Sequence, residues 1–327
     1  MALRAGTLVS VRAGTRARAL DRLRLSDIVF RQLTRAAAFG VLLLLSGVIV
    51  ALMVGSLPAL RTFGLSFLMT ERWNPVTEKF GALAPIYGTL VTSFIAMLIA
   101  VPIGLMIAFF LTELCPQWLR RPIGIAIELL AGIPSIIYGI WGLFIFAPFL
   151  QGTLQPLLIA TLGHMPGIAP LFSGPPYGIG TLTAGLILAI MVLPFVTSIS
   201  RDVFAAVPTV LKEAAYGVGC TTWEVARYVV LPYVRVGVIG GVMLGLGRAL
   251  GETMAVTFVI GNAHRISASL LAPATTISAS IANEFTEAVG DLYTSSLTAL
   301  GLILFVITFI VLAIARYMLM RIERRIG

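Results

Sequence analysis

An arginine and a glutamate lie four residues apart in an apolar stretch of the chain. Arg248 and Glu252 occur in the run GLGRALGETMAV, within an apolar block long enough to form a membrane helix. A charge at membrane depth costs at least about 2.5 kcal/mol on insertion scales, so such residues usually have a function or a specific partner. On one continuous helix over 236–262, the two side chains would be neighbours on the same face.

Two interpretations of this pair stay open from the residues alone. In the first, Arg248 offers its planar, permanently charged donor fork to an oxyanion crossing the membrane, and Glu252 keeps the anion from being trapped. In the second, the two charges form an ion pair that holds helices together. Both predict a face turned toward protein, because Gly237, Gly241 and Gly245 fall within about 80° of one another on that helix and let a second helix approach closely.

Glu128 is a further acid at membrane depth, in a span predicted over 122–150. Pro134 follows it and is expected to interrupt the hydrogen-bond ladder of the helix. Glu128 is predicted to pair with a basic group on a partner chain or to support a gate. The alternative is an acid that extends toward the membrane surface or forms a structural pair. The two histidines and the two cysteines form no spacing motif, so no metal site and no disulfide are predicted.

Long apolar helices must position these residues. The chain has 327 residues, of which 58% are hydrophobic and 11% charged, whereas a soluble domain has about a quarter charged residues. We predict an all-α integral membrane protein in which a membrane domain over 36–320 lies between an Arg-rich tail over 1–35 and a basic C-terminus over 321–327. Six spans are expected near 36–58, 84–113, 122–150, 179–200, 236–262 and 296–318.

The basic residues predict how these spans are oriented. If the N-terminus is cytoplasmic, 18 of the 23 Lys and Arg residues lie on the inner side, four on the outer side, and Arg248 inside a span. The positive-inside rule therefore favours both termini in the cytoplasm. Eight of the arginines lie in the tail over 1–35, where the expected partner is anionic membrane lipid and not nucleic acid.

The inner segment over 201–235 is predicted to form two short helices joined at glycine. Pro208 favours the start of the first helix. Thr221 and Glu224 form a capping box at the start of the second, which Pro232 is expected to stop. Such an element is either a compact knob for a partner protein or an amphipathic loop on the membrane surface.

The same segment resembles the EAA signature of bacterial ATP-binding-cassette (ABC) importer permeases. The matching positions are Glu213, Ala214, Ala215, Gly219, Leu231 and Pro232, with Val229 where isoleucine is commoner. The resemblance implies a type I importer permease fold, with a coupling helix that docks on a cytoplasmic ATPase. The chain itself has no P-loop, because its only lysines, Lys79 and Lys212, are not followed by Ser or Thr. We therefore expect no enzymatic activity and no cofactor in this chain, with ATP and Mg bound by partner ATPase subunits.

Three further sequence runs resemble one subfamily of these permeases. The runs FGALAPIYGTLVTS over 80–93, ELLAGIPSIIYGIWG over 128–142 and GRALGETMAV over 247–256 are similar to phosphate-specific permeases of the PstC type. This implies an importer in the bacterial plasma (inner) membrane that moves phosphate by alternating access. Its other subunits would be a second homologous permease (PstA type), two ATPase subunits (PstB type) and an external phosphate-binding protein (PstS type). The alternatives are a permease for sulfate or molybdate, or a secondary transporter or channel without ATPase partners.

Overall fold

The computed structural model describes residues 2–323, with the side chains of residues 27–321. The chain divides into two units, residues 1–54 and residues 55–327, and each is described by itself. The first unit belongs to the long helix α1 (Ala2–Phe63), so the predicted tail and the first predicted span form one continuous helix. The side chains of the tail arginines before residue 27, and most of the predicted C-terminus over 321–327, lie outside the described residues.

The second unit is built from helices, with one isolated bridge between Asn74 and Lys79 among its described residues. Its helices are α2 (Ser66–Met69), α3 (Leu83–Phe109), α4 (Gln117–Ala131), α5 (Ser135–Trp141), α6 (Ala147–Phe149), α7 (Gln155–Leu162), α8 (Thr181–Ala205), α9 (Thr209–Gly217), α10 (Thr222–Val225), α11 (Leu231–Leu250), α12 (Met254–Val259), α13 (Ile277–Glu284) and α14 (Asp291–Glu323). Four π-helical turns, η1 (Phe110–Leu114), η2 (Gly142–Phe146), η3 (Leu150–Leu154) and η5 (Ala226–Val230), and a 3₁₀ turn, η4 (Ala169–Phe172), lie between them.

Six helical stretches within the described residues are long and apolar enough to cross a membrane. They are Asp27–Phe63, Leu83–Leu114, Ser135–Leu162, Thr181–Ala205, Thr222–Leu250 and Asp291–Arg321. The prediction of an all-helical membrane protein with about six spans is thus confirmed.

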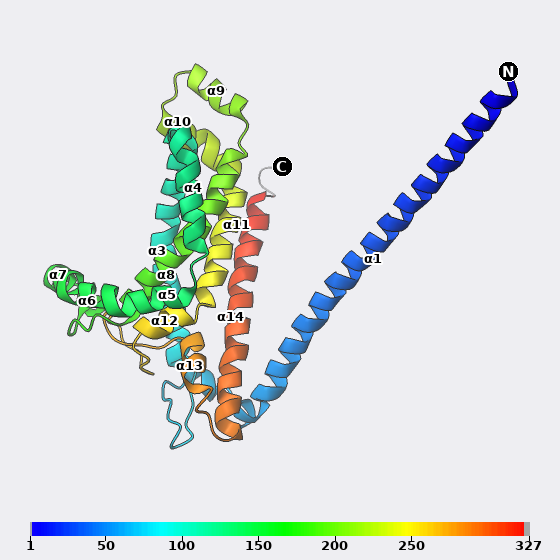
Figure 1. The fold of residues 1–327 in the computed structure, drawn as a ribbon. Coiled ribbons are helices and arrows are strands. Elements are labelled where there is room, and N and C mark those ends of the chain that lie inside the picture. The colour runs from blue at the N-terminus through cyan, green and yellow to red at the C-terminus, as the bar shows by residue number, and fades with distance from the viewer. Residues whose placement is uncertain (1, 324–327) are drawn as a thin grey trace. The chain divides into compact units, whose positions relative to one another are not determined.

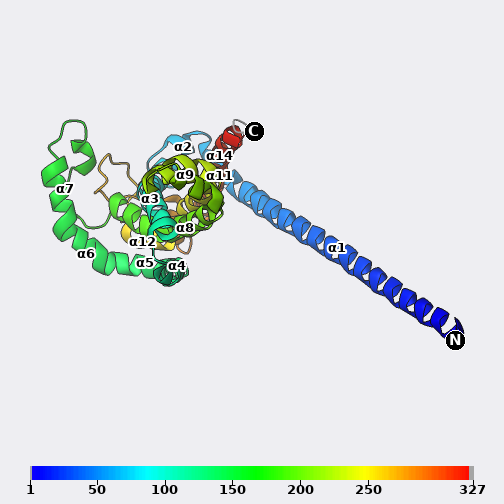
Figure 2. The same ribbon diagram turned by 90° about the horizontal axis from the view of Figure 1, so that it is seen from above.

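The third predicted span, over 122–150, is wrong as a continuous helix. Helix α4 ends at Ala131 and α5 begins at Ser135, after Pro134. Proline lacks the N–H that would continue the hydrogen-bond ladder of the helix. Gly132, two residues before Pro134, has low helix propensity. After this break the chain changes direction: α5, α6 and α7 run across the direction of α4 (Figure 1) and curve outward from the bundle (Figure 2). The apolar stretch long enough to span is consequently 135–162.

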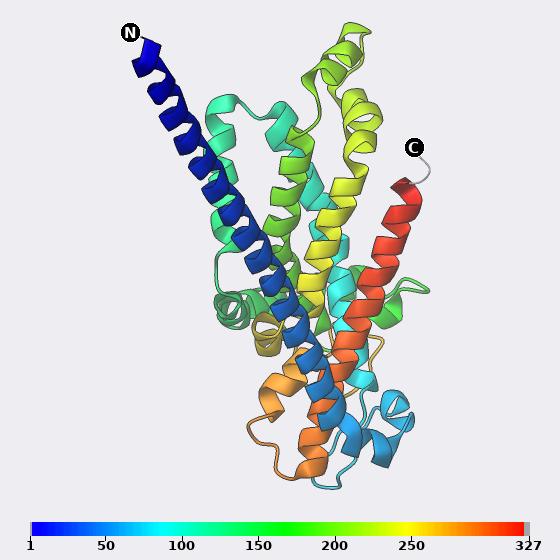
Figure 3. The ribbon, with the colours of Figure 1, turned by 90° about the vertical axis from the view of Figure 1, so that its right-hand side faces the viewer.

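The centre of the bundle is formed by α3, α8 and α11, which pack against one another, with α4 on α8 and α14 on α11. Helix α9 lies at one end of this bundle, and α13 lies at the opposite end (Figure 3). We call these the α9 end and the α13 end. Small residues on α3 and α8, such as Ala96, Ala100 and Ala184, are fully buried and allow the close approach of the two helices.

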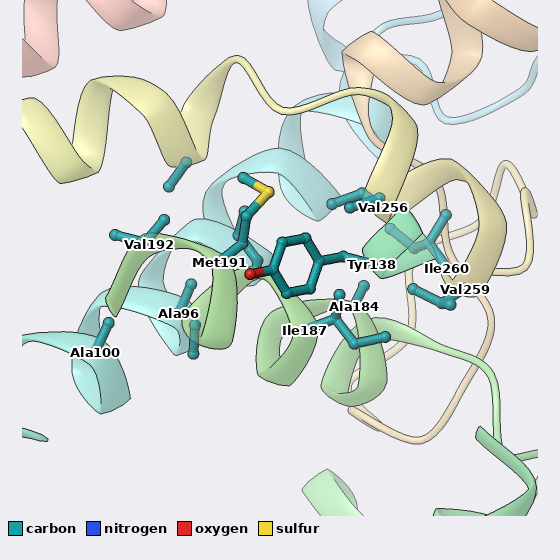
Figure 4. Close-up of a cluster of buried hydrophobic side chains, with 14 of the residues drawn as sticks. Ala96, Ala100, Tyr138, Ala184, Ile187, Met191, Val192, Val256, Val259 and Ile260 are labelled. Carbon is teal, nitrogen blue, oxygen red and sulfur yellow. The ribbon is translucent and has the colours of Figure 1, made fainter. Parts of the chain in front are cut away.

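The main core joins this bundle to α5, which follows the helix break at Pro134, and to α12, which follows the end of α11. Tyr138 of α5 extends toward Met191 of α8, and Val256, Val259 and Ile260 line the other side of the cluster (Figure 4). All five side chains are less than a tenth exposed. Burial of this apolar surface fixes α5 and α12 against α8, so the breaks before them have defined positions.

Candidate functional site

Arg248 lies in the last turn of α11, where a cation interacts favourably with the helix dipole. Its guanidinium carbon sits 4.3 Å from the centre of the Phe195 ring on α8, which is a cation–π contact. The side chain is exposed, and no carboxylate among the described residues forms an ion pair with it. The aromatic ring therefore holds the guanidinium while its donors stay available to an anion.

Glu252 does not share a helix face with Arg248, so the predicted continuous span over 236–262 is wrong. Helix α11 ends at Leu250, and α12 starts at Met254. Gly251 has low helix propensity, and the Glu252 carboxylate accepts a hydrogen bond from the backbone N–H of Ala255 at 3.2 Å. That bond satisfies a free N–H at the start of α12, which favours the break. The two charges lie on either side of a broken helix and form no ion pair with each other.

The glycines of α11 face α8 of the same chain. A Cβ atom built on Gly237 would lie 2.6 Å from Val203 Cγ1, and one on Gly241 would lie 2.8 Å from Ile199 Cγ2. Gly245 is similarly close to Val192 and Val196, at 3.1 Å. We call these three glycines the glycine stripe. The stripe allows α11 to pack closely on α8, and this packing sets the position of Arg248 over the Phe195 ring.

Glu128 pairs within its own chain. Its carboxylate accepts a hydrogen bond from Arg201 Nη2 of α8 at 2.6 Å, and Arg201 also contacts Asp202 at 3.1 Å. Pro134 lies six residues after Glu128, beyond the end of α4, and precedes α5 as its N-cap residue. The structure therefore places Glu128 on the flank of α4 that faces α8, and Pro134 at the bend between α4 and α5.

The segment between α8 and α11 begins as predicted. Pro208 precedes α9, and Gly219, which has a φ of +93°, follows it in a conformation that favours glycine. Thr221 accepts a hydrogen bond from the Glu224 N–H, and the Glu224 carboxylate accepts one from the Thr221 N–H at 2.7 Å. The capping box is confirmed.

Pro232 does not stop the second helix, which corrects that prediction. The chain passes from α10 through η5 into α11 without leaving the helix, and Pro232 lies in the first turn of α11. The Leu231 N–H bonds to the Ala226 carbonyl, five residues back. This wider turn displaces the carbonyl with which the proline ring would clash, so the helix tolerates Pro232.

The EAA residues lie at the surface of the α9 end. Glu213, Ala214 and Gly219 are exposed, whereas Ala215 packs on an apolar cluster with Val225 and Val230. Leu231 and Pro232 are also exposed. Nearby Val218 is 81% exposed and Trp223 66% exposed, so the segment presents apolar side chains at its surface.

An ordered polar cluster at the α13 end was missed from the sequence. Glu284 of α13 accepts hydrogen bonds from Tyr293 Oη and His264 Nε2, both at 2.8 Å, and one from Trp73 Nε1. Trp73 stacks on His264, with ring centres 5.2 Å apart, and Phe80 stacks on Tyr293. We call these five residues the Glu284 cluster. The sequence shows Trp73, His264 and Glu284 in outer segments that are far apart along the chain. Nothing in the sequence near each of them indicates that these segments meet.

The environment of Glu284 perturbs its pKa. Burial alone would raise the pKa, because it disfavours the charged form. The hydrogen bonds from His264, Tyr293 and Trp73, together with the charge of His264, outweigh burial and hold the pKa of Glu284 below its ordinary value. The carboxylate is 18% exposed, so it is an ionised, well-paired group at the α13 end. Among the described side chains, no three His, Cys, Asp or Glu residues gather closely enough to hold a metal ion.

Comparisons with known proteins agree with this architecture. The family model described as "Binding-protein-dependent transport system inner membrane component" matches residues 100–324. A phosphate transport system permease protein PstC of Mesorhizobium japonicum is 74% identical over 306 residues, covering 94% of each chain. The PstC of Pasteurella multocida is 60% identical over 301 residues, covering 92% of this chain and 94% of its own.

A solved structure shows the same fold at low identity. The bacterial alginate ABC transporter, in complex with an alginate pentasaccharide-bound periplasmic protein, has a chain that matches with a TM-score of 0.56 and 17% identity. The match covers 83% of this chain and 88% of that one. The resemblance derived from the three sequence runs is confirmed by the relatives. The chain therefore belongs to the binding-protein-dependent transport system inner membrane components and, within them, to the phosphate transport system permease proteins of the PstC family.

Proposed function

We propose that the chain is the membrane subunit through which an ATP-driven importer moves inorganic phosphate into the cytoplasm, and that Arg248 contacts the anion on its way. The observation that carries this proposal is the Arg248 guanidinium, which is held over an aromatic ring at a helix break and lacks a carboxylate partner among the described residues. A tetrahedral oxyanion accepts two parallel hydrogen bonds from such a fork. Phosphate is the anion we propose, because the relatives are phosphate transport system permease proteins.

The remaining subunits follow from the family and from the surface of the α9 end. We infer a second permease of the PstA type, two ATPase subunits of the PstB type and an external phosphate-binding protein of the PstS type. The exposed EAA residues of α9 would dock on an ATPase subunit, which binds ATP and Mg. Movement of α9 would pass through the turn over 218–221 into α10, from which the helix continues along η5 into α11.

The orientation follows from charge. With the α9 end in the cytoplasm, the basic residues concentrate on the inner side of a bacterial plasma membrane, and both termini are cytoplasmic. The Glu284 cluster at the α13 end then faces outward, toward the binding protein.

Glu252 is proposed to discriminate between oxyanions. One of its oxygens accepts the Ala255 N–H, and its charge lies beside the break. Hydrogen phosphate carries an O–H that can donate to a carboxylate, whereas sulfate has none. We expect Glu252→Gln to reduce the preference for phosphate over sulfate or molybdate in competition assays. An unchanged preference would remove Glu252 from the anion path.

The proposal is tested by ATP-dependent uptake of labelled phosphate into vesicles that contain the whole assembly. We expect Arg248→Ala to abolish uptake while the ATPase subunits remain bound and active, because the fork is lost and no neighbour replaces it. The matched control is Arg316→Ala, which removes an exposed arginine from α14 and should leave uptake unchanged. Wild-type uptake by Arg248→Ala would refute the role of Arg248, and failure of the wild type to carry phosphate would refute the substrate.

A further inference from the structure

A charged cavity of about 720 Å³ lies at the α9 end, outside the Arg248 region. The ends of η1 and α8, one face of α4 and the start of α9 form its walls. Its ionisable lining residues are Arg120, Arg121, Arg201, Lys212, Glu113 and Glu128. No step of the proposed transport mechanism uses them.

The cations in this cavity are not equally compensated. Arg201 is paired with Glu128 at 2.6 Å, and Lys212 is paired with Glu113. Arg120 donates to the backbone carbonyl of Thr112 at 2.7 Å, and neither Arg120 nor Arg121 forms an ion pair with a described carboxylate. Two guanidinium groups that are adjacent in sequence thus bring uncompensated charge to one wall. An anion bound in the cavity would compensate this charge.

The other residues that line the cavity indicate which class of ligand it could bind. Thr112, Gln117 and Thr209 add polar groups, and two arginines present planar forks that match phosphate oxygens better than they match a point-like anion. The volume lies in the range of cavities that hold a whole organic molecule, so a phosphate group with a small substituent also fits. We propose that this cavity is a second phosphate-group site, for free inorganic phosphate or for the phosphate of an anionic lipid headgroup.

The site would have a different role with free phosphate than with a lipid headgroup. Free phosphate here would be the delivered product, bound after it has left the membrane, and this arm rests on the proposed function and orientation. A lipid headgroup would instead anchor the α4–α8–α9 junction to the inner leaflet, and this arm needs only the membrane location. Both arms require Arg120 and Arg121, and neither requires Arg248.

The experiment uses the complete importer assembly in an Arg248→Gln background, so that phosphate bound in the transport path does not contribute. Binding of labelled inorganic phosphate is measured in phosphatidylcholine nanodiscs without ATP or binding protein. Retention of phosphatidylglycerol is measured by native mass spectrometry after reconstitution in mixed lipid. The variant Arg120→Gln/Arg121→Gln is compared with the control Arg227→Gln, which removes an exposed arginine outside the cavity.

We expect the double variant to weaken one of the two ligands by about tenfold or more, since charge-assisted bonds are lost, while Arg227→Gln has no effect. A loss of phosphate binding assigns the site to free phosphate, and a loss of lipid retention assigns it to a headgroup. Unchanged binding of both ligands overturns the proposal. Dissociation of the ATPase subunits from the double variant, with assembly restored by Arg120→Lys/Arg121→Lys but neither ligand bound, also overturns it and makes the cavity a subunit contact. The proposed function would be refuted by wild-type uptake in Arg248→Ala, which is measured on a different residue, so the two proposals fail separately.

Discussion

Glu284 and Arg248 are both charged residues of a membrane protein, but the chain treats them differently. Glu284 receives hydrogen bonds from three side chains that come from three separate segments. Arg248 has one aromatic ring beneath it and no carboxylate partner among the described residues. A charge that its own chain satisfies contributes to the architecture, whereas a charge left open is available to a ligand.

The difference also concerns how each group is positioned. Glu284 is held by direct bonds, so loss of the carboxylate leaves three donors without their acceptor. Arg248 is held by the packing of α11 on α8 through the glycine stripe. The comparison therefore predicts that function depends on Arg248 and stability on Glu284, and four experiments test it.

The largest effect is expected from Arg248→Gln. Phosphate uptake should fall by about 100-fold or more, because two charge-assisted hydrogen bonds to the anion are lost. The free energy of unfolding should change by no more than about 1 kcal/mol, because an exposed cation–π contact with Phe195 is lost but no carboxylate is left unpaired. Uptake assays and thermal unfolding of the same preparation measure both. A large loss of stability with normal uptake would reverse the assignment.

Gly241→Leu should disturb Arg248 without touching it. The side chain would collide with Ile199, 2.8 Å from the Cβ position, and overpacking of this kind costs about 1–3 kcal/mol. We expect lower stability together with reduced uptake. Gly240→Leu is the matched control, because nothing lies within 4 Å of a Cβ atom at Gly240. Equal effects of the two substitutions would show that the glycine stripe does not position Arg248.

Glu284→Gln should destabilise the α13 end. The loss of charge from three hydrogen bonds is expected to lower the free energy of unfolding by about 2 kcal/mol. Uptake by the molecules that remain folded should persist. Glu287→Gln is the control, because Glu287 is exposed and makes no side-chain bond to the cluster. Stability that is the same in both variants would show that the Glu284 cluster contributes nothing.

The smallest effect is a dependence of stability on pH. The pKa of Glu284 is lower in the folded protein than the ordinary value of 4.5, so the unfolded chain takes up the proton first as the pH falls. The stabilisation from Glu284 is present in full above about pH 4.5 and is lost as the pH falls through the folded pKa. Unfolding between pH 3 and pH 7 should show a steeper loss in the wild type than in Glu284→Gln. Parallel curves would contradict this origin of the pKa shift.

Local signals in the sequence predicted much of the fold. Apolar length located four of the six spans but misplaced those predicted over 122–150 and 236–262. The Thr221–Glu224 spacing predicted a capping box that the structure contains. The glycine spacing predicted a close helix contact, because the face of a helix follows directly from its period. These properties depend on residues within a few turns of one another.

The sequence did not reveal features that depend on distant segments or on competing local preferences. The break after Leu250 arises because Glu252 bonds to the next helix start, while apolar content on both sides suggested a continuous span. Trp73 and Glu284 are 211 residues apart and meet only in the folded chain. A basic group of a partner chain was one of the partners considered for Glu128, but nothing near it in sequence identified Arg201 of its own chain.

The wide turn η5 has a consequence for how this family can vary in length. It contains one residue more than an α-helical turn would use, and it connects α10 to α11. Deletion of a single residue over 226–230 would convert the wide turn into a regular one and leave the helix after it facing as before. Deletion of a residue from the regular helix over 232–236 would instead rotate everything after it by about 100°. The glycines would then turn away from α8, and Arg248 would leave the Phe195 ring. The wide turn is therefore the part of this long helix at which the loss of one residue should be tolerated best.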